Sequence, residues 1–352
     1  MHHNNNFHFL RLMAAILVIY GHSYPLLGLG HLDYIQELTG GLFPSAQIGV
    51  CIFFAISGYL IAKSLKSSTP VKFVQKRLLR IYPGLIAAVL FTMFVIGPIA
   101  TTASLSEYFS SVETYFYIRV LKLFPNYPDS LPYVFKNLPV GLVNGSLWTL
   151  AYEITCYGAL LLSYIIFGNR IKFALLTVFL LLWSTYLFWY DFLTRHPNQL
   201  RIIHLSLLDL LNFGLYFLVG NLIYFFQHLI KYQWYWLSGL ILIFVSAYVL
   251  SAFYGLIPLA GIAWTRYLLL PYALFYFGLK TGILNSVGKI GDLSYGLYIY
   301  AFPVQQLIVT FYGMKISATQ MFLSSLIFLL PIAWLSWNYI ESPFLKLKSK
   351  VK

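Results

Sequence analysis

The distribution of apolar residues along the chain predicts a bundle of membrane-spanning helices. Long apolar runs alternate with short polar connections, and most runs reach the roughly 20 residues that a helix needs to cross a bilayer. The expected helices cover ten ranges: 7–28, 46–66, 82–99, 146–167, 173–190, 205–227, 235–253, 265–279, 293–312 and 318–340. The fold class is therefore all-α, a polytopic transmembrane helical bundle.

Composition supports the same class of protein. Of the 352 residues, 60% are hydrophobic and 9% are charged, whereas soluble domains carry about 25% charged residues. The net charge of +13 sits largely in short connections, so it indicates membrane topology rather than a nucleic-acid surface. Cys51 and Cys156 lie in apolar runs, where we expect small core residues and no metal site.

The positions of lysine and arginine predict the orientation of the chain. With the N-terminus in the cytoplasm, 15 of them lie on the inner side and 7 on the outer side, Arg266 among the latter and Arg11 in neither group. This excess predicts that both termini are cytoplasmic. We expect a transmembrane domain over 1–345 and a basic cytoplasmic tail over 346–352.

Two ionisable residues, Arg11 and His22, lie in the first apolar run. Eleven helical steps make about three turns plus about 20°, so both side chains share one face, roughly 16 Å apart along the axis. Ionisable groups inside a membrane segment are costly and mark functional sites. This helix face is therefore the first candidate site.

A second candidate is the basic stretch 72–83, with Arg77 and Arg80 on one helical face. Pro83 suits the first turn of the helix expected to follow. Arginine binds phosphate by forked hydrogen bonds. Topology and lipid headgroup contact explain the same pair equally well, so spacing alone leaves both interpretations open.

Several motifs resemble, in order and spacing, those of the acyltransferase-3 family of integral membrane acyltransferases. The matching residues are Arg11 with His22, the Phe-Phe-x-x-Ser-Gly run ending at Gly58, Arg77-x-x-Arg80-Ile-x-Pro83, Ser146-Leu-Trp-Thr-Leu-x-x-Glu153, Gly291-x-x-Ser-Tyr-x-x-Tyr298 and Glu341-x-Pro-Phe344. Ala301 stands where many relatives have a second intramembrane histidine, so the resemblance assigns the catalytic role to His22.

The resemblance implies a membrane-bound O-acyltransferase of the bacterial inner membrane. Its donor would be a cytoplasmic acyl-CoA, usually acetyl-CoA, and its acceptor a hydroxyl of a surface glycan such as lipopolysaccharide O-antigen or exopolysaccharide. His22 would act as general base or carry the acyl group covalently. Arg11, Arg77 and Arg80 would bind the donor. The alternatives are a glycolipid transporter or flippase, and a helical scaffold for glycan assembly.

Three further residues complete this scheme, and Glu153 is its second catalytic candidate. Glu153 lies well inside an apolar helix and could orient His22, pair with an arginine, bind a sugar hydroxyl, or tie helices together. For Ser57 we expect close helix packing rather than catalysis, because no histidine lies near it in sequence. Glu341 is expected to end the last helix and to meet the basic tail.

Overall fold

The computed structural model describes residues 5–30, 32–124, 129–197, 199–256 and 258–347, and helices dominate these residues. The chain forms two compact units. Unit 1 comprises Met1–Arg11, Val50–Pro70 and Tyr152–Gly288, and unit 2 comprises Leu12–Gly49, Val71–Ala151 and Lys289–Lys352. The domain boundary expected at 345 stays a prediction, and the tail from 348 onward lies outside the described residues.

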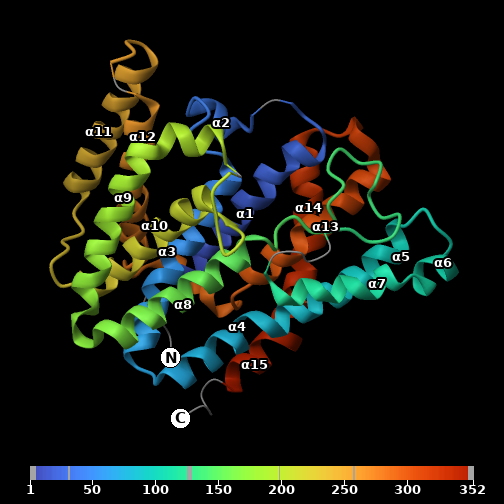
Figure 1. Cartoon of the computed structure of the whole chain (residues 1–352). Helices are drawn as coiled ribbons and strands as arrows, with labels where there is room; N and C mark the ends of the chain where they lie inside the picture. The colour runs from blue at the N-terminus through green and yellow to red at the C-terminus, as the bar shows by residue number, and fades with distance from the viewer. Residues whose placement is uncertain (1–4, 31, 125–128, 198, 257, 348–352) are drawn as a thin grey trace. The chain divides into compact units, whose positions relative to one another are not determined.

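The helices have the following bounds (Figure 1): α1 Phe7–Leu26, α2 Tyr34–Leu38, α3 Ser45–Lys66, α4 Pro70–Phe91, α5 Gly97–Ala100, α6 Leu105–Ser110, α7 Val112–Phe116, α8 Thr149–Phe167, α9 Ile171–Arg195, α10 Leu207–Phe226, α11 Trp234–Ala252, α12 Leu259–Gly278, α13 Ser294–Tyr312, α14 Ala318–Ser336 and α15 Ser342–Leu347. Short π-helical segments, Thr92–Ile96 and Trp337–Glu341, join α4 to α5 and α14 to α15. Two-residue strands, β1 Arg201–Ile202 and β2 Leu205–Ser206, pair antiparallel.

The prediction of an all-α protein with several apolar helices of membrane-spanning length is confirmed. Within the described residues, seven helical segments are long and apolar enough to cross a membrane. They are α1, α3, α4 through α5, α8 through α9, α10, α11, and α14 through α15. Each of the ten expected ranges holds a helix, but how many cross the membrane, and on which side the termini lie, stay predictions.

Two helix starts lie six or more residues before the predicted ones. The helix expected over 82–99 begins at Pro70, so Pro83 lies inside it rather than in its first turn. The basic stretch is amphipathic, because Phe73 and Ile81 are buried within α4. The helix expected over 265–279 begins at Leu259, and Arg266, counted among the charges of the outer side, is buried within α12.

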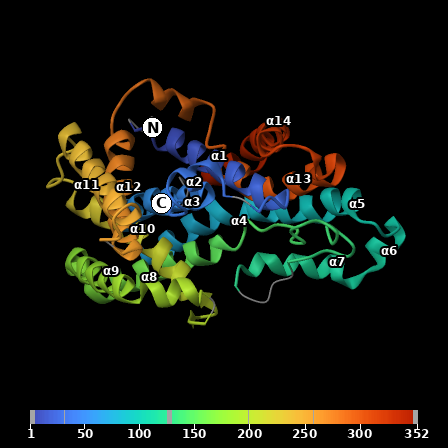
Figure 2. The ribbon, with the colours of Figure 1, turned by 90° about the horizontal axis from the view of Figure 1, so that it is seen from above.

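In unit 1, two glycines let α3 and α10 pack closely. A Cβ on Gly58 would meet the backbone of Phe217, and a Cβ on Gly220 would meet the backbone of Ala55. Small residues allow such approaches between membrane helices. The packing role predicted for the Ser57-Gly58 pair therefore holds for the glycine. In the same unit, α11 and α12 lie side by side (Figures 1 and 2).

In unit 2, α13 is buried along most of its length. It lies beside α14 (Figures 1 and 2), and Gly296 faces Ala333 at the contact. The segment before α8 also packs on α13, because the side-chain amide of Asn144 donates to the carbonyl oxygen of Ile299 at 2.9 Å. Unit 2 thus surrounds α13 with α14 and this connecting segment.

Candidate active site

His22 lies on α1 in unit 2 and is half-buried. Its Nδ1 is buried and has no hydrogen-bond partner among the described residues. The imidazole packs edge-on against Phe302 of α13, with ring centroids 5.5 Å apart. The preceding residue, Gly21, lies so close to Ala46 of α3 that a Cβ would not fit. The turn that carries His22 is therefore fixed against α3 and α13.

Gln305 of α13 holds the same turn and was missed by the sequence analysis. Its Nε2 donates to the carbonyl oxygen of Ile19 at 2.9 Å and to the Ser23 hydroxyl at 3.3 Å. The adjacent Gln306 is also fully buried. Neither side chain is charged, so a search for ionisable groups passes over them. Two consecutive amides inside an apolar helix are the signal that could have found them.

Arg11 lies on the part of α1 that belongs to unit 1. It is half-buried, and its guanidinium lies 5.8 Å from the ring centroid of Phe53 on α3. A cation over an aromatic face is attracted by the ring quadrupole. This contact accommodates a charge inside an apolar helix, and the role of Arg11 toward a donor stays a prediction.

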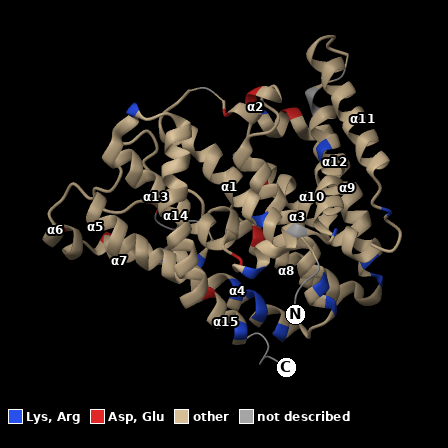
Figure 3. Ribbon diagram, turned by 180° about the vertical axis from the view of Figure 1, so that it is seen from behind, with Lys and Arg blue, Asp and Glu red and all other residues tan. Residues whose placement is uncertain are grey.

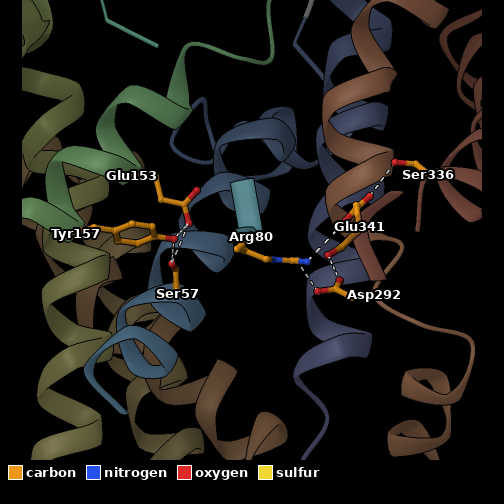
Figure 4. Close-up of polar contacts among 8 residues, drawn as sticks. Ser57, Arg80, Glu153, Tyr157, Asp292, Ser336 and Glu341 are labelled. Atoms are coloured by element: carbon orange, nitrogen blue, oxygen red, sulfur yellow. Dashed lines mark hydrogen bonds and ion pairs between the residues drawn. The ribbon is translucent and has the colours of Figure 1, made fainter. Parts of the chain in front are cut away.

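Glu153 is the centre of a polar cluster in unit 1 that joins α3 to α8 (Figure 4). Its Oε1 accepts hydrogen bonds from the Ser57 hydroxyl at 2.9 Å and from the Tyr157 hydroxyl. The two hydroxyls are themselves 2.9 Å apart. Of the roles considered for Glu153, the tie between helices is the one these contacts supply directly. Its catalytic role stays a prediction.

Arg80 forms a buried charge cluster in unit 2 (Figure 4). Its Nη2 lies 2.6 Å from Oδ2 of Asp292, and its Nη1 lies 3.7 Å from Oε2 of Glu341. Hydroxyls support both carboxylates, since Ser294 donates to Asp292 and Ser336 donates to Glu341. Because both carboxylates are buried, the pairing compensates charges that would otherwise be costly.

The expectation that Glu341 ends the last helix was wrong, whereas its contact with the basic tail stays a prediction, because residues 348–352 lie outside the described residues. The helix does not end there, because Trp337–Glu341 continues into α15, and the Glu341 carboxylate faces Arg80. Two residues of the predicted tail, Lys346 and Leu347, lie within α15. A carboxylate next to a basic tail suggests a surface contact, but burial makes an internal partner necessary.

Arg77 lies one helical turn before Arg80 on α4. Its guanidinium is 5.8 Å from the ring centroid of Phe73, and the side chain is half-buried. Figure 3 shows basic residues gathered along the first half of α4. Both arginines of the predicted pair lie over an aromatic ring, Arg80 at 5.4 Å from the ring centroid of Tyr295, and Arg80 also lies between two carboxylates.

Arg266 is a second buried cation, in unit 1. Its Nη2 donates to the hydroxyls of Tyr186 and Tyr267, at 3.1 and 3.2 Å, and to the amide oxygen of Asn212. In the part of the chain that the structure describes, its Nε has no hydrogen-bond partner. Among the same residues, no group of three His, Cys, Asp or Glu side chains could hold a metal ion.

Comparison with known proteins assigns the chain to a family of enzymes. The family model for the acyltransferase domain, acyltransferase-3, matches residues 4–338. The chain therefore belongs to this family, as the motifs predicted.

Two relatives refine this assignment. The chain is 30% identical over 357 residues to an O-acetyl transferase of Shigella phage Sf6, covering 98% of this chain and 97% of that protein. It is 35% identical over 164 residues to nodulation protein 10 of Rhizobium leguminosarum bv. viciae, covering 44% of this chain and 42% of that protein. No solved structure shows significant similarity. The prediction of an acyltransferase enzyme of the O-acetyltransferase type is confirmed.

Proposed function

We propose that this enzyme transfers an acetyl group from cytoplasmic acetyl-CoA to a hydroxyl of a cell-surface glycan, such as lipopolysaccharide O-antigen or exopolysaccharide, in the bacterial inner membrane. The observation that carries the proposal is His22, an imidazole held rigidly inside an apolar helix with an unpartnered, buried Nδ1 among the described residues. The similarity to a phage O-acetyl transferase over nearly the whole chain supports acetyl as the transferred group.

In this mechanism His22 is the general base. A sugar hydroxyl is a weak nucleophile until its proton is removed, and imidazole takes protons readily near neutral pH. His22 Nε2 accepts the proton as the sugar oxygen bonds to the thioester carbonyl carbon. The carbon–sulfur bond then breaks, the acetyl ester remains on the sugar, and the leaving thiolate takes the proton back from His22. All atoms and charges balance without a further reactant.

A variant of the mechanism has His22 attack the thioester itself. The imidazole nitrogen would then carry the acetyl group and release it to the sugar hydroxyl. Both routes need the same nitrogen to be accessible to the reacting atoms, and both are abolished by removal of the imidazole.

For the donor we assign Arg11, Arg77 and Arg80. Guanidinium groups hold phosphates by paired hydrogen bonds, and coenzyme A carries three phosphate groups. We keep Glu153 as the second catalytic candidate, with its hydrogen bonds to Ser57 and Tyr157 holding the carboxylate in one orientation.

The test compares wild type with His22→Ala and with His204→Ala, an exposed histidine that serves as control. Each is expressed in a bacterium that makes a surface polysaccharide, and the polysaccharide is weighed by mass spectrometry at matched enzyme levels. We expect one acetyl mass per modified sugar with wild type and with His204→Ala, and none with His22→Ala.

Other outcomes point to specific errors. Full modification by His22→Ala would exclude His22 as base, and a different added mass would exclude acetyl-CoA as donor. If wild type adds no mass and the purified protein does not bind acetyl-CoA, the proposed function is wrong and the transporter alternative gains support.

A further inference from the structure

Two buried polar atoms in unit 2 are chemically complementary and both lack a partner among the described residues. One is Nδ1 of His22 on α1, and the other is Oε1 of Gln305 on α13. Buried polar atoms without hydrogen bonds are rare in folded proteins, and each calls for an explanation. An imidazole N–H is a donor and an amide oxygen is an acceptor, so each atom offers what the other lacks.

The orientation of the Gln305 amide is fixed by its contacts with α1. The carbonyl oxygen of Ile19 can only accept a hydrogen bond, so the amide nitrogen must face it, at 2.9 Å. The same nitrogen lies 3.3 Å from the Ser23 hydroxyl. Consequently Oε1 is the atom left over. Ile19 and Ser23 lie three residues before and one residue after His22, within a single helical turn.

The His22 ring also contacts the face of α13 that carries Gln305. The ring packs against Phe302 with centroids 5.5 Å apart. Phe302 precedes Gln305 by three residues, and residues three apart are neighbours on a helix surface. On α13, the residue that contacts the His22 ring and the residue that carries the amide therefore lie within one helical turn of each other.

We propose that Gln305 is the positioning residue of His22: its Nε2 holds the turn of α1, and its Oε1 accepts the Nδ1 hydrogen of the imidazole when substrate is bound. This inference rests on the proposed function, in which His22 is the base. A hydrogen bond at Nδ1 selects the tautomer whose Nε2 lone pair faces the sugar hydroxyl. It also stabilises the ring once Nε2 has taken the proton.

The charged and titratable groups near this turn have other hydrogen-bond partners, so the Gln305 amide is the candidate acceptor for the Nδ1 hydrogen of His22. On α1 itself, the hydroxyls of Tyr20 and Tyr24 bond to each other at 2.8 Å. Asp33 precedes α2, and both of its carboxylate oxygens are occupied: they accept hydrogen bonds from the backbone and hydroxyl of Ser45 at the start of α3 and from the backbone of Gln36 in α2. From α13 the ring meets uncharged Phe302 and the Gln305 face. A carboxylate is the usual partner of a catalytic histidine, and here an amide stands in that place.

The experiment uses full-length enzyme in membranes with acetyl-CoA and the surface polysaccharide of the producing strain, and follows release of the CoA thiol across a pH series. Gln305→Met removes both hydrogen-bonding functions at nearly constant volume. Gln305→Glu keeps an acceptor oxygen. Gln306→Met is the matched control, because Gln306 is equally buried but donates to the carbonyls of Val140 and Leu142 instead of to α1.

We expect Gln305→Met to lower kcat about tenfold or more, with the KM for acetyl-CoA within about twofold of wild type. Gln305→Glu should recover part of the rate and move the acid limb of the pH–rate profile to higher pH, because a carboxylate stabilises the protonated imidazole. Gln306→Met should leave the profile unchanged.

Each alternative result has a distinct meaning. If Gln305→Met keeps the wild-type kcat while His22→Ala is inactive, this inference is wrong and the proposed function stands. If His22→Ala is active, the proposed base fails and the inference fails with it. Equal losses in Gln305→Met and Gln306→Met, or an unshifted profile in Gln305→Glu, would reduce Gln305 to a packing residue. The last result decides the matter even if Gln305→Met does not fold.

Discussion

Arg80 of α4 and Asp292, just before α13, form an ion pair across 212 positions of sequence, with the guanidinium Nη2 2.6 Å from the carboxylate Oδ2. A second carboxylate, that of Glu341, lies 3.7 Å from Nη1 of the same guanidinium. One end of unit 2 is thus held by a basic residue shared between two buried acids.

This sharing predicts an order of stability among variants. Arg80→Ala leaves two buried carboxylates without their guanidinium, and we expect it to lower the free energy of unfolding by about 3–5 kcal/mol. Asp292→Asn removes one negative charge while Glu341 still faces Arg80, so its effect should be smaller. The thermal midpoint of purified protein in detergent measures both. A larger loss in Asp292→Asn than in Arg80→Ala would contradict the shared pairing.

Arg77 is predicted to affect donor binding rather than the chemical step. Loss of a charged hydrogen bond to phosphate removes about 1.5–3 kcal/mol, so Arg77→Ala should raise the KM for acetyl-CoA about tenfold or more with kcat little changed. Lys76→Ala, the adjacent basic residue of α4, is the control and should stay within about twofold. A fall in kcat at constant KM would argue against a phosphate contact.

Glu153 can be tested for structure and chemistry separately. Glu153→Ala leaves the Ser57 and Tyr157 hydroxyls without their acceptor and should destabilise the protein by about 1–3 kcal/mol. Glu153→Gln retains an acceptor oxygen, so the amount of enzyme in the membrane should match wild type. If Glu153 is catalytic, acetylation by Glu153→Gln falls at least about tenfold. Normal acetylation would leave Glu153 as a tie between α3 and α8.

Gly58 is predicted to be intolerant of even a methyl group. The added Cβ of Gly58→Ala would meet the Phe217 backbone of α10, and such overpacking costs about 1–3 kcal/mol. Gly158 of α8 is a matched control, since nothing lies within 4 Å of its added Cβ. Gly158→Ala should be neutral or stabilising by up to about 1 kcal/mol. Thermal midpoints that move equally in both variants would refute the close approach.

The buried Arg266 gives a fifth prediction. The amide oxygen of Asn212 accepts from Arg266 and from the Tyr186 and Tyr267 hydroxyls. Asn212→Asp would place a carboxylate beside the guanidinium with all three donors already oriented. We expect a higher thermal midpoint for this variant and a lower one for Asn212→Leu, measured in the same detergent. A lower midpoint for Asn212→Asp would contradict this account of the cluster.

The helices could be predicted from the sequence because an apolar run of membrane length has few alternative structures. The predicted start of α4 was wrong because charged residues lie inside the helix. Basic residues in 72–80 suggested a connection, yet this stretch buries Phe73 and forms the first turns of α4. Arg266 was misplaced in another way: it was counted among the outer charges, whereas tyrosines and an amide accommodate its charge inside α12.

Contacts between residues far apart in the sequence were harder to predict than helices, for a physical reason. Local periodicity shows which face of a helix is apolar, but it does not show which distant residue a buried charge meets. Arg80 could be singled out from the sequence, but its carboxylate partners could not be predicted. Gln305 was overlooked because it carries no charge, although its hydrogen bonds to α1 hold the turn that carries His22.

The buried charge of α12 bears on how the protein enters the membrane. Within the described residues, α12 is not among the segments apolar enough to cross a bilayer by themselves, and Arg266 finds its hydrogen-bond acceptors on α9 and α10. Both of those helices precede α12 in the chain and leave the ribosome first. We therefore expect α12 to enter the membrane against helices already in place, and we expect deletion of α9 and α10 to prevent its insertion even though its own sequence is intact.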